Sequence, residues 1–128
     1  MNADVLRWLE YADADLDVAS FLFENRYPQP LEIICFHCQQ AAEKAIKAVY
    51  LWAEVPGGIP RKHDLAFLLE QLTGRLSIEE KYFDCAEALN PFGISARYPN
   101  EIHVDEMIAR EAIHFAHEII CWAKEIII

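Results

Sequence analysis

One stretch decides how this chain folds: Phe36-His37-Cys38-Gln39-Gln40-Ala41-Ala42-Glu43-Lys44-Ala45-Ile46-Lys47-Ala48. It has no Gly or Pro and few β-branched residues, so it predicts a helix. At about 100° per residue, small and apolar side chains gather on one side of that helix, at Ile34, Cys38, Ala41, Ala45, Ala48 and Trp52. Polar side chains form a second ridge at spacings of three and four, namely His37, Gln40, Lys44 and Lys47. The first face predicts close helix packing, and the ridge is either solvent-facing or a binding surface.

A second long helical pattern precedes this stretch. Apolar residues step by four and three through Val5, Leu9, Ala12, Leu16, Ala19 and Phe23, which predicts a helix over residues 3–25. Pro28 and Pro30 then interrupt the pattern, and the next helix is expected over 31–53. Two long helices joined by a short break predict an antiparallel hairpin.

The second half of the chain predicts three further helices. Asp64 is a plausible N-cap for a helix over 65–73, and Ser77 with Glu80 forms a capping-box pattern for one that ends near Leu89. Residues 90–100 predict an irregular loop, with two prolines and a glycine. The last helix is expected from Asp105 to the end, with an apolar stripe at Val104, Ile108, Ala112, Phe115, Ile119, Trp122 and Ile126. The prediction is an all-α, up-and-down bundle of about five helices: two long antiparallel N-terminal helices, two short ones and one long C-terminal one.

Length and composition predict one domain over residues 1–128. The 128 residues match the commonest domain size, and a hydrophobic content of 54% is ample for one core. We expect no membrane span, because no run of about 18 apolar residues occurs. The N-terminus shows no signal-peptide pattern, so a cytoplasmic location is expected. A net charge of −10 argues against nucleic-acid binding through a general basic surface, but it leaves room for a local basic pocket.

Charged and apolar surfaces at the two ends of the chain each have two interpretations. Acidic residues of the first helix lie away from its apolar seam, at Glu10, Asp13, Asp17 and Glu24. They form either an acidic docking or metal surface or simply a solvated face, which is the favoured interpretation. The run Ile126-Ile127-Ile128 leaves an apolar C-terminus, which predicts a subunit contact.

The cysteines are best interpreted as core residues. Cys35-x-x-Cys38 has the spacing of half a zinc site or of a redox pair, and His114-x-x-His117 could complete a site only by a coincidence of packing. The cysteine pair lies inside a helical pattern, however, and no second Cys-x-x-Cys occurs. Buried, reduced cysteines are therefore favoured. We expect no metal and no cofactor.

Polar residues that could carry chemistry lie in three places: the ridge of the second helix, the basic run Arg61-Lys62-His63, and Arg97-Tyr98 with His103 beyond it. The chain has no Gly-rich phosphate loop, no His-Glu-x-x-His and no nucleophile elbow. Lys44 and Lys47 could bind phosphate, and Glu43 with Lys47 could equally be a surface ion pair. For His63 a hydrogen bond at the helix start is favoured over ligand binding. Tyr98 could stack on a base, but pinning its loop to the core is favoured.

Three short blocks occur in order along the chain: Phe36-x-x-Gln39-Gln40-Ala41-x-Glu43-Lys44-x-x-Lys47-Ala48, then His63-Asp64-Leu65, then Ala96-Arg97-Tyr98-Pro99. Together they resemble the HEPN domain family (higher eukaryotes and prokaryotes nucleotide-binding), and the likeness covers nearly the whole chain. The resemblance implies an up-and-down helical bundle that usually forms a homodimer. It also implies association with minimal nucleotidyltransferases, often encoded next door, in toxin–antitoxin-like pairs.

The resemblance also implies a candidate nuclease site. Many members are metal-independent ribonucleases with an Arg, four to six arbitrary residues and then a His, and Arg97 and His103 fit with five residues between them. In the best-defined toxins four residues intervene and a Tyr lies two beyond the His, where this chain has Asp105. In this interpretation Arg97 holds the scissile phosphate and His103 is the general acid/base for attack by the RNA 2′-hydroxyl. The alternative is that Arg97 is a surface or helix-capping residue.

The sequence therefore supports three hypotheses. The leading one is a homodimer that binds a nucleotide or nucleic-acid phosphate, a minimal nucleotidyltransferase partner, or both, through the residues His37, Gln40, Lys44, Lys47, His63 and Tyr98. The second is a metal-independent RNA endonuclease that uses Arg97 and His103. The third is a non-catalytic interaction module that uses the acidic first helix or the apolar C-terminus. Whether the protein is an enzyme stays open at this point.

Overall fold

A computed structural model of the chain describes residues 2–95 and 103–128. It contains six helices: α1 (Ala3–Asn25), α2 (Leu31–Trp52), α3 (Leu65–Leu72), α4 (Glu80–Leu89), α5 (Phe92–Ser95) and α6 (Glu106–Ile127). Within those two ranges there is no strand. The predicted all-α bundle is confirmed, and each of the expected helices is present. The short α5 is an addition, because it lies where the sequence predicted only an irregular loop.

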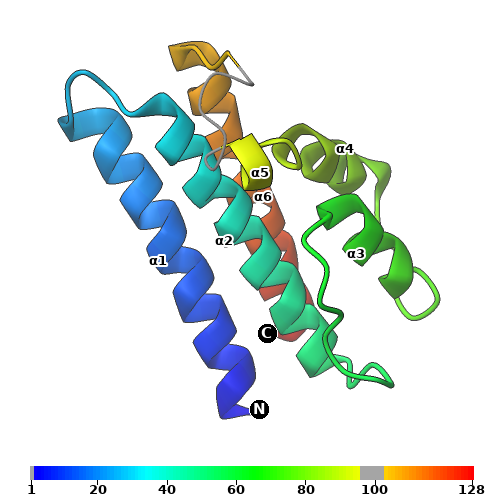
Figure 1. The fold of residues 1–128 in the computed structure, drawn as a ribbon. Coiled ribbons are helices and arrows are strands. Elements are labelled where there is room, and N and C mark those ends of the chain that lie inside the picture. The colour runs from blue at the N-terminus through cyan, green and yellow to red at the C-terminus, as the bar shows by residue number, and fades with distance from the viewer. Residues whose placement is uncertain (1, 96–102) are drawn as a thin grey trace.

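Helix α2 is the centre of the bundle. It runs antiparallel to α1, and α6 lies behind it and descends in the same direction (Figure 1). Helices α3 and α4 cover its other side, and α5 packs against its N-terminal half. Neighbours on several sides explain why α2 is buried around most of its circumference, including three polar residues, Gln39, Glu43 and Lys47. The single packing face predicted from small residues was therefore too narrow.

The predicted seam of α1 forms the contact with the rest of the bundle. Its first five members, Val5, Leu9, Ala12, Leu16 and Ala19, are buried, and Phe23 is half-buried. Asn2 caps this helix, because its side-chain oxygen accepts a hydrogen bond from the backbone N–H of Asp4 at 2.8 Å. The seam positions α1 along α2 and leaves its outer side without a neighbouring element (Figure 1).

In the second half of the chain, two of the three predicted helix starts are correct. Asp64 accepts a hydrogen bond from the backbone N–H of Phe67, and Asp105 caps α6 in the same way. The Ser77 capping box is wrong, because α4 begins at Glu80 and its N-cap, Glu79, makes no side-chain capping bond. Ile78, which precedes the helix, is half-buried and packs against the core, a tertiary contact that the local capping pattern does not include.

Most of the apolar C-terminus packs against the core of the bundle. Ile127 is buried and Ile126 is half-buried, so only Ile128 is exposed. The predicted subunit contact at this end is therefore reduced to one side chain.

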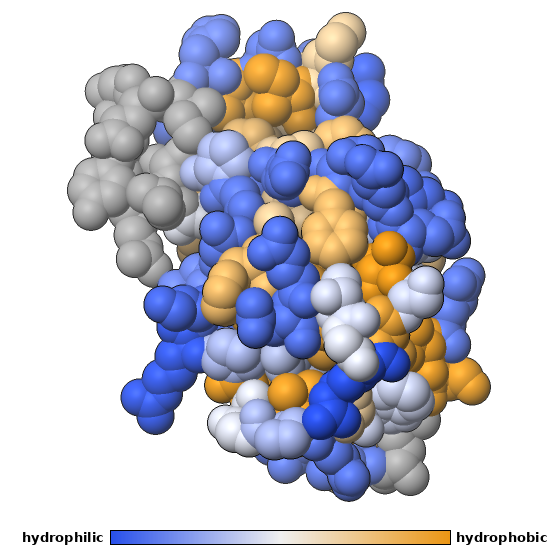
Figure 2. Space-filling view, turned by 90° about the vertical axis from the view of Figure 1, so that its right-hand side faces the viewer, coloured by the Kyte–Doolittle hydropathy of each residue, from blue (hydrophilic) through white to orange (hydrophobic). Residues whose placement is uncertain are grey.

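The face that carries α3 and α4 is mainly hydrophilic, with apolar side chains showing between the polar ones (Figure 2). Among the described helices, none is both long and apolar enough to cross a bilayer.

The two cysteines of the Cys35-x-x-Cys38 motif are fully buried in α2, as expected for core residues. Burial, with a smaller effect from nearby Glu32, raises the pKa of the Cys35 thiol to about 12. Burial also raises the pKa of Cys38, and the neighbouring Cys35 and Asp15 add to that rise. Both thiols are therefore protonated at neutral pH, as is typical of unreactive core cysteines.

Candidate functional site

Glu43 is the centre of a buried polar cluster on α2. Its carboxylate lies 2.8 Å from Lys47 Nζ, one turn along the helix, and 3.0 and 3.1 Å from Nδ1 of His63. Gln39 donates a further hydrogen bond to Glu43 at 3.3 Å. Burial raises the pKa of the Glu43 carboxyl, but the hydrogen bonds from Lys47 and His63 outweigh it, so the net shift is downward. The predicted Glu43–Lys47 pair therefore exists, but it is buried rather than at the surface.

The cluster fixes the orientation of the His63 imidazole. Because an ionised carboxylate only accepts hydrogen bonds, the proton between His63 and Glu43 belongs to Nδ1 of the ring. The other nitrogen, Nε2, is then left for a ligand, either as an acceptor or, in the charged ring, as a donor. The side chain of His63 is 70% exposed, whereas that of Glu43 is 8% exposed. A buried carboxylate thus holds an accessible histidine in one orientation.

Gln39 connects this cluster to α5 and to the loop before α3. Its amide nitrogen also donates to the backbone oxygen of His63, at 3.2 Å, and its oxygen accepts from Gln40 at 2.7 Å. Gly93 of α5 lies directly over it, so closely that a Cβ on Gly93 would meet the Gln39 carboxamide carbon at 2.9 Å. A larger residue at position 93 would therefore have to displace the buried, hydrogen-bonded Gln39 carboxamide.

Asp64 and Asn90 join the start of α3 to the end of α4. Asn90 donates from its side chain to Asp64 at 2.9 Å, and its oxygen accepts from the backbone N–H of Leu65 at 2.7 Å. The same Asp64 oxygen caps α3. This reciprocal pair of bonds sets the position of His63, which immediately precedes Asp64 in the chain.

These groups surround a cavity of about 300 Å³ between α2, the start of α3 and the α4–α5 junction. Its lining combines one aromatic ring with several polar side chains: Phe36, Gln39, Gln40, His63, Asp64, Asn90 and Gly93. The volume is at the lower end of the range for small-molecule sites, and a few converging polar groups on an apolar wall are typical of such sites. Across residues 2–95 and 103–128, no cluster of three or more His, Cys, Asp or Glu residues could hold a metal ion.

The rest of the predicted polar ridge faces α1 instead of this cavity. His37 Nδ1 lies 3.1 Å from Asp15, and Lys44 Nζ lies 2.5 Å from the other oxygen of the same carboxylate. Asp15 thus ties α1 to α2 across a half-buried ion pair. Of the four ridge residues, only Gln40 lines the cavity. Lys47 is connected to it indirectly, through its hydrogen bond to Glu43. His37 and Lys44 do not contribute to it.

A family model for the HEPN domain matches residues 5–126, which is nearly the whole chain. The chain belongs to the HEPN domain family. Solved structures of similar fold agree with this assignment. The protein TT1696 from Thermus thermophilus has 28% sequence identity and a TM-score of 0.78, with 94% of this chain and 96% of that chain covered. ST0689, described as an archaeal HEPN homologue, has 27% identity and a TM-score of 0.76, with 97% and 98% covered.

A HEPN domain protein from Thermotoga maritima has the same fold, with 24% identity, a TM-score of 0.73 and coverage of 94% and 96%. Among curated proteins, no sequence matches this chain. The comparisons therefore establish the family and the fold, and the chemistry of this HEPN domain has to be argued from its own residues.

The three HEPN sequence blocks are only partly described by the structure. The first block supplies one wall of the cavity and the second supplies His63 and Asp64. Arg97 and Tyr98 of the third block lie outside the described residues. His103 is described: it is exposed and is followed by the buried Val104 and by Asp105, the N-cap of α6.

Several residues of this arrangement were not among the predicted site residues, including Phe36, Asp64 and Gly93 of the cavity lining. Gln39 and Glu43 lie inside the HEPN block, and their spacing of four already allowed a side-chain bond on one helix face. Asp15 was counted only as part of an acidic helix, and nothing local in the sequence pairs it with α2. Asn90 lies far from Asp64 in sequence, and no local pattern connects the two residues.

Proposed function

We propose that this HEPN domain binds a nucleotide or a nucleic-acid phosphate in the cavity between α2, α3 and α5, as a cytoplasmic homodimer. The observation that carries the proposal is the oriented His63, held by buried Glu43 at the wall of a cavity that also presents the Phe36 ring. Phe36 supplies a surface on which a base can stack. His63 supplies a nitrogen for a phosphate oxygen, and the exposed Arg61 and Lys62 precede it in the chain.

The polar groups of the cavity suit the remainder of a nucleotide. The Gln40 amide and the Asp64 carboxylate can bond a ribose hydroxyl or an exocyclic amine. A phosphate needs local positive charge to offset the net charge of −10, and Arg61 and Lys62 directly precede His63 in the chain, although they line a neighbouring pocket and not this cavity. Lys44 and Lys47, which the sequence also suggested as phosphate ligands, are each within ion-pair distance of a carboxylate. We therefore assign the phosphate contact to the His63 side of the cavity.

The test is calorimetric titration of the chain with mononucleotides and with short single-stranded RNA. We expect binding of at least one of these ligands, weakened at least tenfold by His63→Ala, since loss of one charge-assisted hydrogen bond costs about 1.5–3 kcal/mol. His114→Ala removes an exposed histidine of α6 outside the cavity and is the matched control. Absence of binding to every nucleotide and RNA, or equal weakening by the control, would contradict the proposal.

A second candidate function is metal-independent RNA cleavage by Arg97 and His103. It is favoured by membership of the HEPN family together with the exposed position of His103 at the start of α6. RNA incubated with the chain in the presence of a chelator should be cut, and Arg97→Ala and His103→Ala should each abolish cutting. RNA that stays intact, or variants that cut as well as the original chain, would eliminate this candidate.

The proposed partners are a second copy of the chain and a minimal nucleotidyltransferase, as in toxin–antitoxin-like pairs. Light scattering should give about twice the chain mass of 14.8 kDa. The second partner is tested by mixing the chain with a nucleotidyltransferase encoded beside its gene and measuring the mass of the mixture. Separate elution of the two proteins would contradict that pairing and would leave nucleotide binding unaffected.

A further inference from the structure

Helix α1 has a second apolar stripe on the side that faces away from the bundle. Tyr11, Val18 and Phe21 are 55%, 42% and 64% exposed, and Ala14 is exposed between them. Their spacing of three, four and three residues places them on one line along the helix, as in the seam of a coiled coil. The buried seam of α1 already anchors it to α2, so the outer stripe is not needed for the fold.

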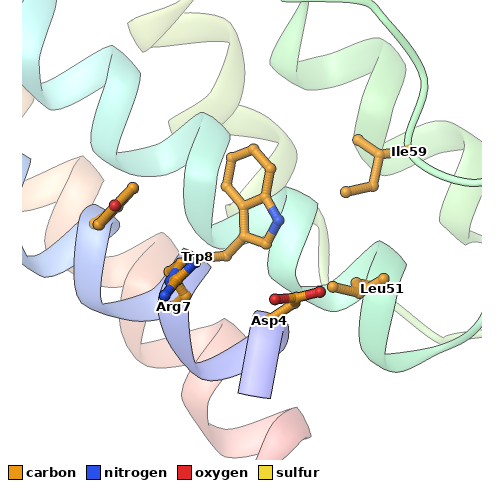
Figure 3. Close-up of a pocket in the computed structure, with 6 residues that line it drawn as sticks. Asp4, Arg7, Trp8, Leu51 and Ile59 are labelled. Carbon is orange, nitrogen blue, oxygen red and sulfur yellow. The ribbon is translucent and has the colours of Figure 1, made fainter. Parts of the chain in front are cut away.

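The stripe leads into a pocket at its N-terminal end. This pocket of about 400 Å³ lies between α1, the end of α2 and the loop before α3, and Tyr11 belongs to both features. Its other lining residues are Asp4, Arg7, Trp8, Leu51 and Ile59. The Trp8 indole extends from α1 toward Leu51 and Ile59, which makes one wall of the pocket aromatic (Figure 3). A pocket of this kind at the end of an exposed stripe can receive one large side chain as an anchor.

Charge determines which occupant fits this surface. Glu10, Asp17 and Glu24 follow one flank of the stripe at intervals of seven residues, and all three are exposed. In the part of the chain that the structure describes, none of them lies within ion-pair distance of a cation. Charges in these flanking positions select the partner of a helix pair. An antiparallel second copy of α1 would bring the three acids opposite the same three acids, which disfavours self-pairing.

We propose that the outer face of α1, with the Trp8 pocket at its end, docks an amphipathic helix of a partner protein that carries apolar residues at heptad spacing flanked by Lys or Arg. The apolar residues cover Tyr11, Val18 and Phe21, and one large side chain fills the pocket. The flanking cations pair with Glu10, Asp17 and Glu24. This proposal is independent of the nucleotide site, because α1 lies on one side of α2, whereas α3, α4 and α5, whose ends contribute to the lining of the cavity, lie on the other (Figure 1).

The experiment uses two synthetic peptides of about three heptads with leucine at the seam positions, one with lysine and one with glutamate on the flanks. Fluorescence anisotropy should show that the chain binds the lysine peptide, less tightly as salt rises, and does not bind the glutamate peptide. Val18→Glu should weaken binding of the lysine peptide at least tenfold. This outcome is informative because the added negative charge would by itself attract that peptide.

Met107→Glu is the matched control, since Met107 is 66% exposed on α6 and lies off the stripe. It adds the same charge and should leave binding of the lysine peptide unchanged or slightly stronger. The proposal is overturned if the lysine peptide does not bind, if both peptides bind equally, or if Val18→Glu has no effect. It is also overturned if Val18→Glu converts a dimeric chain into a monomer, because the occupant would then be a second copy.

Discussion

At the scale of single residues, the candidate site depends on one carboxylate that the sequence shows as an ordinary member of a helical block. Glu43 lies beneath the cavity and accepts hydrogen bonds from Gln39, Lys47 and His63, so three side chains take their positions from it. A buried charge of this kind is costly unless its partners remain in place. The orientation of His63 and the local stability should therefore change together when Glu43 is altered.

Glu43→Gln should lower the free energy of unfolding at pH 7 by about 2 kcal/mol, because buried Lys47 and the His63 ring lose their charged acceptor. The pKa of Glu43 in the folded chain is below its ordinary value of 4.5, so its charge stabilises the fold above pH 4.5. That contribution disappears as pH falls through the lower folded pKa. Denaturant unfolding at several pH values should therefore show that the original chain and the Glu43→Gln variant differ less in their free energies of unfolding below pH 4.5.

Glu125→Gln is the control for this substitution, because Glu125 is exposed near the end of α6. Surface changes of this type usually alter stability by less than about 0.5 kcal/mol. A Glu43→Gln chain as stable as the control at pH 7 would show that the buried cluster contributes nothing to folding.

Gly93→Ala should destabilise the chain by about 1–2 kcal/mol and weaken nucleotide binding, because the new Cβ would overlap the buried Gln39 amide. Gln39 cannot move freely, since its amide bonds both Glu43 and the backbone oxygen of His63. Gly74→Ala is the matched control, with nothing within 4 Å of the added carbon. Thermal unfolding and nucleotide titration check both variants, and an equal effect of the two would argue against close α5–α2 packing.

At the scale of secondary-structure elements, the sequence predicts what depends on local periodicity and caps. The bounds of α1 and the cap at Asp64 were predictable, because an apolar seam and an N-cap each depend only on residues that lie close together in the sequence. The start of α4 was not, because Ile78 packs against the core just before the helix, and a local capping pattern gives no information about such a tertiary contact. The short α5 was missed for a similar reason, since its contact with α2 depends on Gly93 lying over the distant Gln39.

The site itself was only half predictable from the sequence. Helical spacing correctly places Gln40 and Lys47 on one face, but periodicity gives an angle around the helix and not the element that faces it. It therefore could not separate Lys44, which pairs with Asp15 of α1, from Lys47, which bonds Glu43. The side-chain hydrogen bond from Asn90 to Asp64 joins the end of α4 to the start of α3, and only the folded chain brings the two residues together.

Asp64→Ala tests this junction of elements. It removes both the cap of α3 and the acceptor for Asn90, so the free energy of unfolding should fall by about 1–2 kcal/mol. Asp64→Ser keeps a capping oxygen and should recover most of that loss. Because His63 precedes this residue, nucleotide affinity should decrease in the alanine variant. If the alanine and serine variants unfold alike in urea, the cap is not what stabilises the start of α3.

At the scale of the whole molecule, α2 separates two surfaces with different chemistry. The α3–α5 side holds the polar cavity, and the α1 side presents the apolar stripe with its acidic flank. Substitutions at distant sites without shared partners are usually additive. His63→Ala and Val18→Glu combined should therefore give nucleotide affinity no lower than His63→Ala alone, as measured by calorimetry. Further weakening in the double variant would mean that the two surfaces are coupled through α2.

The end of the bundle where both termini lie gives the last prediction (Figure 1). Ile127 is 6% exposed and closes this end beside Val5 and Leu51, whereas Ile128 is 82% exposed. Ile127→Ala should therefore cost about 2 kcal/mol of unfolding free energy, at the lower limit for a buried isoleucine because the site is at a helix end. Ile128→Ala should change stability by less than about 0.5 kcal/mol. If Ile128→Ala instead halves the mass measured by light scattering, the exposed isoleucine is a subunit contact, because its loss cannot act through the core.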